Sequence, residues 1–441
     1  MSSLIKFLLV AGMSVVAGAL GFARPPNVVL IMADDMGYEC LGVNGSLSYE
    51  TPRLDELAAK GLRFTNAYST PLCTPSRVQI MTGRYNVFNY EEFGYLNPNL
   101  PTFGHLMQDA GYATLIAGKW QLNGISHGPE KFEGWDDPMR PGAAGFDEWS
   151  LWQVTQPKKI AERFWDPLIE QNGDVLHAEL AGTYGPDHFT EYICDFIERK
   201  RDEPFFVYYP MVLVHDPFIS TPDSVDPEVT GQEAFADMMR YADKLVGRIV
   251  DKLAAENLLD DTIIILTADN GTDRKIVSQI AAREIVGGKG QTIDDGIHVP
   301  MIAYWKGRTP EGGITDQLVD FTDFKMTLAD LTGTESKGPL DGVSFLPALE
   351  DRMGPEREWI FCHYDPRWGR FRSQRSAFAS DGQFKVYHDG RVFAVTDDVM
   401  ESEPLADAAV PADVLRQLRN ALASYPDFPA EETAFGEPLL P

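Results

Sequence analysis

Cysteine is scarce in this chain of 441 residues, which has only Cys40, Cys73, Cys194 and Cys362. Four cysteines are too few for a fold built on disulfide bonds, and no Cys/His cluster has the spacing of a zinc site. Basic residues are also outnumbered, with 38 Lys and Arg against 66 Asp and Glu and a formal net charge of −28. This charge argues against nucleic acid and against an anionic membrane surface as partners, because both bind basic proteins. An anionic substrate would require positive charge concentrated in one pocket.

Long hydrophobic runs are rare, and the first one has the pattern of a secretory signal peptide. Lys6 supplies a positive start, residues 7–20 are mostly apolar, and residues 21–23 form a small-x-small end. We expect residues 1–23 to be cleaved on export, which would make the protein periplasmic or secreted. The run is short and has no charged stop-transfer flank, so we expect no stable membrane anchor.

Four apolar runs predict buried strands, at residues 27–35, 113–120, 204–217 and 262–271, and Pro210 is a candidate break in the third. They are unbroken rather than alternating, as in parallel strands that are covered on both faces. Helical patterns lie between them, among them residues 51–61, with Thr-Pro at the start and glycine at the end, and residues 233–257, with one long apolar face. This alternation predicts an α/β domain at 24–354, with a mostly parallel central sheet flanked by helices.

The pattern changes after about residue 354. Short β-prone runs occur at residues 359–361, 376–379, 384–388 and 391–394, with Asp-Gly turns at 381–382 and 389–390, and a helical stretch follows at 411–425. We therefore expect residues 355–441 to form a small C-terminal subdomain, an antiparallel sheet plus a helix.

The four predicted strands end in polar side chains, which are Asp34 and Asp35, Lys119, His215, and Asp269 and Asn270. Ligand sites of open α/β sheets lie beyond the carboxyl ends of the strands, so these groups should meet. Each alone has a simpler structural explanation, such as a turn aspartate or a hydrogen-bonded core histidine. Together they predict a site, and the oxygen atoms of its acids and its asparagine suit a hard cation such as calcium or magnesium.

Cys73 lies where a loop enters a predicted helix. Thr74 is the expected N-cap and Pro75 the first helical residue, with Arg77 one turn further in. The positive end of the helix dipole favours a bound anion at this position. From these residues alone, a reactive cysteine, a core cysteine and a disulfide partner all remain open.

The segment CTPSR at 73–77, followed by TGR at 82–84, resembles the signature of the type I sulfatases, in the alkaline phosphatase-like superfamily. Other family motifs occur in the family order: ADDMG at 33–37, GKW at 118–120, HDP at 215–217, ADNG at 268–271, GGKG at 287–290 and GIHVP at 296–300. The resemblance is strong over residues 27–307 and faint beyond them. It implies the sulfatase fold, with a C-terminal antiparallel sheet and helix, and the hydrolysis of sulfate esters.

The resemblance also implies a role for each matching residue. A maturation enzyme would oxidise Cys73 to Cα-formylglycine, whose hydrate attacks sulfur and then expels sulfate. One calcium ion would be held by Asp34, Asp35, Cys73, Asp269 and Asn270. Arg77 would hold the aldehyde hydrate, and Lys119 and Lys289 would bind sulfate oxygens. His215 would protonate the departing alcohol, with Lys289 assisting.

Gln121 departs from the family pattern. It stands two residues after Lys119, where the family usually has the histidine that acts as the base in expelling sulfate. Glutamine can hydrogen-bond the aldehyde hydrate but cannot accept a proton at neutral pH. We expect an active sulfatase whose substrate is a sulfated glycan or another sulfated small molecule. A phosphonate or phosphate ester hydrolase, and a catalytically impaired binder of sulfated glycans, remain as alternatives.

The preference for a sulfated carbohydrate rests on aromatic residues between positions 121 and 157. They are Phe132, Trp135, Phe146, Trp149 and Trp152. Such side chains stack on sugar rings, but they pack equally well in a protein core.

Overall fold

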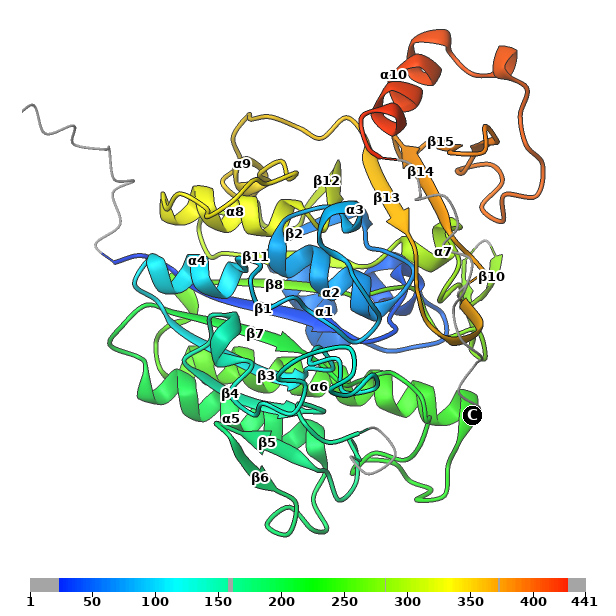
Figure 1. Ribbon diagram of the computed structural model, residues 1–441. Coiled ribbons are helices and arrows are strands. Elements are labelled where there is room, and N and C mark those ends of the chain that lie inside the picture. Colours follow the sequence, from blue (N-terminus) through cyan, green and yellow to red (C-terminus); the bar gives the residue numbers. More distant parts are fainter. Residues whose placement is uncertain (1–23, 158–161, 282, 372, 427–441) are drawn as a thin grey trace, which may run out of the picture.

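The computed structural model describes residues 24–157, 162–281, 283–371 and 373–426 (Figure 1). The predicted signal peptide, residues 1–23, lies outside this part of the chain. Within the described ranges, no helix has the length and apolar character needed to cross a membrane.

A ten-stranded sheet forms the centre of the molecule, in the order β12-β2-β11-β8-β1-β7-β3-β4-β5-β6. The four predicted strands are β1 (Asn27–Ala33), β3 (Ala113–Lys119), β7 (Phe205–Pro210) and β8 (Thr262–Ala268). They lie side by side as β8-β1-β7-β3, and every pair among these neighbours is parallel. They are almost entirely buried, which confirms the interpretation of the unbroken apolar runs.

Six further strands extend the sheet on both sides. They are β2 (Leu62–Tyr68), β4 (Glu148–Trp152), β5 (Ile169–Gln171), β6 (Asp174–Leu176), β11 (Met301–Tyr304) and β12 (Gly313–Asp320). Strand β11 is antiparallel to both of its neighbours, and β5 is antiparallel to β4 and β6. The sequence analysis did not predict these strands, which are short or only partly buried.

Helices cover both faces of the sheet (Figure 1). Helices α1 (Pro52–Lys60), α5 (Gly185–Arg199) and α6 (Gly231–Ala255) pack together on one face, and α2 (Cys73–Thr82), α4 (Phe103–Asp109) and α8 (Asp323–Thr332) on the other. The short helices α3 (Asn86–Asn89), α7 (Asp294–Ile297) and α9 (Leu346–Leu349) lie in connecting segments. Helices α1 and α6 confirm the two helices predicted at residues 51–61 and 233–257.

The C-terminal part forms a separate antiparallel sheet with a helix, as predicted. Its strands are β13 (Ile360–Tyr364), β14 (Ser376–Ser380), β15 (Phe384–Tyr387) and β16 (Val392–Ala394), and α10 (Ala412–Ala423) packs against them. The division of the chain at residue 354 stays a prediction. This sheet is bonded to the segment that follows Lys289. Tyr364 donates to the carbonyl of Gly290 (3.2 Å), and Lys385 donates to the carbonyl of Thr292 (2.8 Å).

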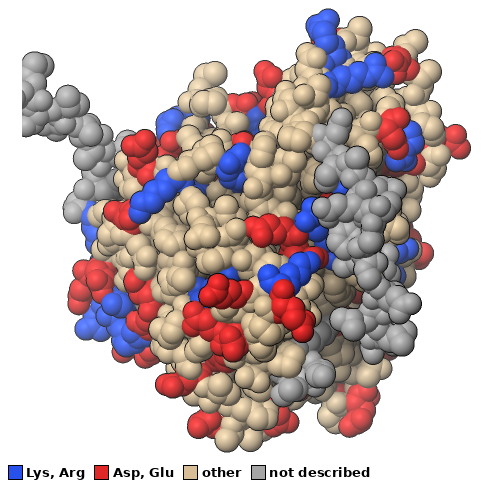
Figure 2. Space-filling model, viewed as in Figure 1, with Lys and Arg blue, Asp and Glu red and all other residues tan. Residues whose placement is uncertain are grey.

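Charged side chains are mixed over the face shown in Figure 2. In the described part of that face, Lys and Arg are scattered among Asp and Glu and do not form a continuous basic surface. The buried cations described below therefore differ from this mixed face, in a chain whose net charge is −28.

A buried arginine joins the C-terminal part to the main sheet. Arg357 is 7% exposed and its Nε lies 2.9 Å from the carboxylate of Asp323, at the start of α8. Its other nitrogens donate to Tyr85 (2.7 Å) and to Thr322 (3.0 Å). Removing one partner of such a pair leaves a buried charge uncompensated.

We predict that Arg357→Ala lowers the free energy of unfolding by about 3–5 kcal/mol, because Asp323 loses its counter-charge. The matched control is Arg391→Ala, which removes an exposed pair with Asp389 and should cost at most about 1 kcal/mol. Urea denaturation of both variants measures the difference. Equal small losses in the two variants would contradict the importance of this contact.

Candidate active site

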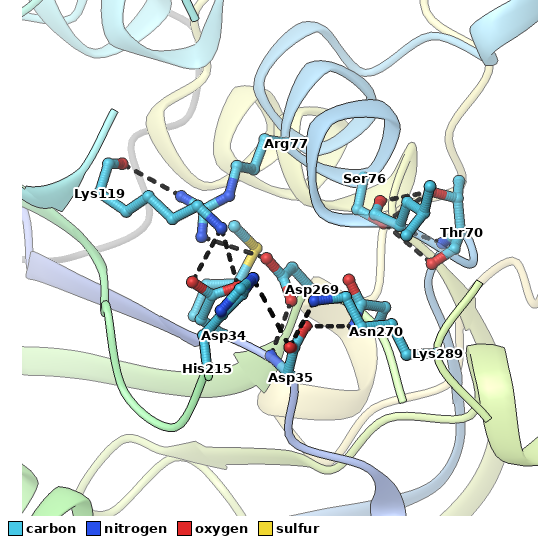
Figure 3. Close-up of polar contacts among 12 residues, drawn as sticks. Asp34, Asp35, Thr70, Ser76, Arg77, Lys119, His215, Asp269, Asn270 and Lys289 are labelled. Atoms are coloured by element: carbon cyan, nitrogen blue, oxygen red, sulfur yellow. Dashed lines mark hydrogen bonds and ion pairs between the residues drawn. The ribbon is translucent and has the colours of Figure 1, made fainter. Parts of the chain in front are cut away.

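The side chains predicted at the strand ends meet at one edge of the sheet (Figure 3). Asp34 and Asp35 directly follow β1, Asp269 and Asn270 directly follow β8, and Lys119 is the last residue of β3. Because these three strands run in the same direction within one group of neighbours, their carboxyl ends point to the same place.

His215 reaches the same site from a loop rather than from a strand end. Strand β7 stops at Pro210, the candidate break in the predicted run 204–217, so the strand does not extend to His215. Proline has no backbone N–H and cannot continue a central hydrogen-bonded ladder. The following loop places Nε2 of His215 3.8 Å from Oδ2 of Asp35, and Nδ1 2.9 Å from a carboxylate oxygen of Asp216.

Asp34 is fully buried and bound by Lys119. The Lys119 ammonium donates to both carboxylate oxygens, at 2.9 and 2.8 Å. Burial by itself would raise the pKa of Asp34, but the charges of Lys119, His215, Arg77 and Lys289 hold this pKa far below its usual value. Asp34 is therefore ionised.

Asp35 is the second carboxylate of the pocket. One of its oxygens accepts from the amide of Asn270 (2.8 Å), and the other is bound by the ammonium of Lys289. Burial lowers the pKa of His215 in the same pocket, and the charge of Lys289 lowers it further, while Asp35 opposes the shift. Asp35 is thus surrounded by the amide of Asn270, the ammonium of Lys289 and the ring of His215.

Asp269 is the third carboxylate, and Arg77 is its counter-charge. The Arg77 guanidinium donates to Asp269 (3.1 Å) and to the carbonyl of Lys119 (3.1 Å), so it ties two strand ends together. Burial, followed by the charge of Asp34, raises the pKa of Asp269 to about 7. Three carboxylates this close in a dry pocket repel one another, and this arrangement favours a bound cation.

Cys73 is the first residue of α2, with Leu72 at the N-cap position. The prediction that Thr74 caps this helix is wrong, because Thr74 lies inside the first turn and its hydroxyl accepts from the backbone N–H of Gly94 (3.2 Å). Cys73 is buried, and all four cysteines, which lie in the described part of the chain, are unpaired, so the structure gives Cys73 no disulfide role.

Hydrogen bonds fix the loop before Cys73 and join it to the Lys289 segment. The hydroxyl of Ser76 accepts from the backbone N–H of Thr70 (3.0 Å) and bonds its hydroxyl (2.7 Å), as Figure 3 shows. The backbone N–H of Gly290 donates to the carbonyl of Pro71 (2.8 Å). The nucleophile candidate and Lys289 are thereby held on adjoining loops.

The acids and the cysteine form two overlapping groups suited to a cation. Asp34, Cys73 and Asp269 make one group, and Asp34, Asp35 and His215 make the other; within each, the ligand atoms lie within 4.8 Å of one another. The side-chain oxygen of Asn270 is buried and has no hydrogen-bond partner among the residues that the structure describes. A buried oxygen without a partner is costly, and a cation would satisfy it. We therefore favour Asn270 over His215 as a ligand, since hard cations prefer oxygen.

Gln121 lies beside this pocket on a sharply turned backbone. Its φ is 53°, and its peptide N–H donates to the carbonyl of Gln153 (3.1 Å), which continues the pairing of β3 with β4. Its side chain makes no hydrogen bond within the described ranges. The ring nitrogens of His298 bond to Asp294 (3.1 Å) and Thr65 (2.8 Å), so His298 is engaged elsewhere and does not replace the usual base.

The sequence analysis missed two side chains close to the site. Arg163 places Nη1 3.8 Å from Oδ2 of Asp34, and it lies in a loop outside every motif, so no sequence signal pointed to it. Gln153, directly after β4, has a buried side-chain oxygen without a partner. Its position one residue beyond a strand end was a usable signal, but β4 itself was not predicted.

The aromatic residues proposed to stack on sugars are mostly core residues. Phe132, Phe146, Trp149 and Trp152 are at most 7% exposed.

A different aromatic residue, Trp368, is accessible. It is 42% exposed and stacks on Phe93, with ring centroids 4.5 Å apart and the planes at 15°. Phe93 packs in the same apolar cluster as Cys73. Trp368 thus stacks on a member of the apolar cluster that contains Cys73.

Comparison with known proteins agrees with this geometry. The family model described as Sulfatase matches residues 26–334. The chain is 30% identical over 373 residues to human N-acetylgalactosamine-6-sulfatase, covering 75% of this chain and 67% of that protein. It is 34% identical over 377 residues to human arylsulfatase A, covering 79% and 72%. A solved structure in complex with its substrate D-glucosamine-2-N,6-O-disulfate has a TM-score of 0.70 at 19% identity, covering 91% of this chain and 97% of that chain.

We predict that calcium stabilises the protein after chelator treatment, because it binds only the folded pocket. At a hundred times its Kd, the ion should add about 2.7 kcal/mol to the free energy of unfolding. The variant Asp35→Asn should lose this increment. Asp243→Asn, which changes a buried aspartate that bonds the start of α1, should retain it from a lower baseline. Urea denaturation with and without calcium tests this, and an increment that survives in Asp35→Asn would place the ion elsewhere.

Proposed function

The chain belongs to the sulfatase family and is a sulfuric ester hydrolase, and on this premise we propose that it hydrolyses sulfate esters of carbohydrates with residue 73 as the nucleophile, in the formylglycine form, and with one bound calcium ion. The observation that carries the proposal is the meeting of Cys73 with three carboxylates and three cationic side chains in one buried pocket.

The charges of the pocket suit an anionic ester. Asp34, Asp35 and Asp269 are paired one to one with Lys119, Lys289 and Arg77, so the pocket without a cation is close to neutral. A divalent cation leaves an excess of two positive charges. Such an excess binds a sulfate ester, although the protein as a whole is strongly acidic.

The calcium ion and formylglycine would each supply one kind of chemistry. A calcium ion would be held by Asp34, Asp35, Asp269, Asn270 and residue 73, and it would polarise a sulfate oxygen and lower the pKa of a neighbouring hydroxyl. Formylglycine, in its hydrated form, would supply a hydroxyl nucleophile.

The side chains of this chain bind and orient the substrate and move its protons. Arg77, already held by Asp269 and by the Lys119 carbonyl, fixes the hydroxyl groups of residue 73. Lys119 and Lys289 donate to the sulfate oxygens, on which negative charge grows in the transition state. His215, with Nδ1 held by Asp216, presents Nε2 towards the pocket and protonates the departing alcohol oxygen.

Gln121 reduces the rate of this reaction. In the proposed mechanism it orients the hydroxyls of residue 73 by hydrogen bonding and accepts no proton. Expulsion of sulfate then depends on water or on a less well placed group, so we expect this step to limit turnover.

The proposed substrate class rests on two observations. The names of two similar proteins specify sulfated amino sugars, as N-acetylgalactosamine-6-sulfatase and as the complex with D-glucosamine-2-N,6-O-disulfate. In this chain, the exposed ring of Trp368, which stacks on a member of the cluster that contains Cys73, offers a flat apolar surface that suits the face of a sugar ring.

We also propose that the protein is exported by the signal at residues 1–23 and matured by a formylglycine-generating enzyme. The proposed substrates, sulfated glycans, are extracellular polymers, and the acidic net charge keeps such a protein soluble.

We predict that the peptide containing residue 73 carries an aldehyde when the protein is made in a host with the maturation enzyme. Mass spectrometry of that peptide, followed by assays on sulfated sugars, aryl sulfates and phosphate esters, tests the proposal. A peptide that stays entirely thiol, in a protein that still binds sulfated glycans, would favour the binder. Preferred hydrolysis of phosphate or phosphonate esters would favour the other enzyme.

We predict that His215→Ala lowers kcat on a sugar sulfate by about 10²–10⁴-fold and that Lys289→Ala lowers it by about 10²–10³-fold. The His215 loss should be smaller on an aryl sulfate, because a phenolate departs without being protonated. The control is Lys325→Met, which changes a buried lysine bonded to Pro101 and should leave kcat unchanged. Full activity of either site variant would refute its assigned role.

A further inference from the structure

Arg163 is a buried cation of the pocket that belongs to none of the sulfatase motifs. It is 4% exposed, and its Nη1 lies 3.8 Å from Oδ2 of Asp34. Within the described ranges the guanidinium makes no hydrogen bond, and Nη1 is buried without a partner. Both oxygens of Asp34 are already bound by Lys119, so this carboxylate does not account for Arg163. A buried N–H donor such as Nη1 is costly unless it binds an acceptor.

The direction of Arg163 is set by an aromatic ring. Its guanidinium carbon lies 4.3 Å from the centre of the Trp152 ring. Trp152 is the last residue of β4 and is paired with Lys119, the last residue of β3. Stacking uses the flat face of the guanidinium and leaves its N–H edge free, so Arg163 enters the pocket from the Lys119 side with its donors available.

The backbone around Arg163 is also fixed. The carbonyl of Phe164 accepts from the N–H of Gly185 (2.7 Å), and the indole of Trp165 donates to the carbonyl of Ser220 (3.0 Å). A Cβ atom on Gly185 would lie 2.2 Å from the carbonyl oxygen of Arg163, so only glycine permits this approach. The loop therefore holds Arg163 in place before any substrate binds.

We propose that Arg163 is a further substrate-binding residue of this site and that it donates to oxygen atoms of the reacting sulfate group, beside Lys119. The inference rests on the proposed function, since it takes the ligand of the pocket to be a sulfate ester. The planar edge of a guanidinium matches two oxygens of a tetrahedral anion. Nη1 of Arg163 lies 3.8 Å from Oδ2 of Asp34, a carboxylate proposed to bind the cation. Because the cation would contact the reacting sulfate, this distance places Arg163 at the reacting group rather than at a distant part of the substrate.

Arg163 has a different task from the histidine that Gln121 replaces. A guanidinium does not release its proton in proteins, so it cannot act as the base. The Arg163 guanidinium instead adds a positive charge at the place where the sulfate group binds and from which sulfate is released. With the calcium ion in place, the excess positive charge of the pocket rises from two to three.

Binding of inorganic sulfate, measured by calorimetry in the presence of calcium, tests the proposal without turnover. The background is Cys73→Ala, which cannot form the nucleophile. We expect Arg163→Gln to weaken sulfate binding by about tenfold to a hundredfold, as for the loss of hydrogen bonds to a charged group. Arg163→Lys, which keeps the charge but not the planar edge, should give an intermediate loss. If Arg163→Gln fails to fold, the sulfate affinity of Arg163→Lys tests the proposal in its place.

Arg140→Gln is the matched control. Arg140 is another buried arginine, which donates to the carbonyl of Leu96 and lies over the ring of Tyr95. Its variant should bind sulfate as the Cys73→Ala background does. Unchanged sulfate affinity in both Arg163 variants would overturn the proposal.

A kinetic measurement separates the reacting sulfate from a neighbouring anion. In the matured protein, Arg163→Gln should lower kcat/KM for an aryl sulfate, which has one anionic group, as strongly as for a sugar disulfate. A loss confined to the disulfate would show that Arg163 binds a second anionic group, and would overturn the assignment. If the parent protein neither binds sulfate nor hydrolyses any sulfate ester, the proposed function itself fails. If it does both and the Arg163 variants match it, only this inference fails.

Discussion

The mutual repulsion of three carboxylates in one dry pocket is the constraint on which the site depends. Asp34, Asp35 and Asp269 are all fully buried at the carboxyl ends of neighbouring strands. Such groups are tolerated only when each has a counter-charge, and here three cationic side chains arrive from a helix, a strand end and a loop. We propose that this arrangement holds a divalent cation, which would give the pocket an excess of positive charge. The same balance explains how a protein with a net charge of −28 can recognise an anionic ester.

Much of this site is predictable from the sequence, because the order of parallel strands decides which strand ends meet. The unbroken apolar runs of β1, β3 and β8 were sufficient to place Asp34, Lys119 and Asp269 together. Strand β4 was not predicted because it is a short run of five residues, and β12, at the edge of the sheet, was not predicted because its partial burial leaves no clear period. The position of His215 was misjudged because a loop, rather than a strand, carries it into the pocket. Arg163 was beyond prediction, because only the packing of its loop against Trp152 brings it near Asp34.

The C-terminal sheet contributes to the site by support rather than by chemistry. Tyr364 and Lys385 bond the carbonyls of Gly290 and Thr292, the residues that follow Lys289. The loop before Cys73 is bonded to Gly290 as well. Lys289 is therefore held between two independent parts of the fold, and its ammonium can stay close to Asp35 at little entropic cost. A preorganised cation of this kind stabilises growing charge better than a mobile one, because it does not need to reorganise during the reaction.

The central claim is that one divalent cation lies among the three carboxylates, next to residue 73. Crystals grown with calcium and diffracted at a wavelength where calcium scatters anomalously test it most directly. If the cation binds there, one anomalous peak lies in contact with Asp34, Asp35, Asp269 and Asn270, with residue 73 as a further neighbour. A pocket that stays free of an anomalous peak at saturating calcium, with Lys119, Lys289 and Arg77 still bound to the three carboxylates, would contradict it.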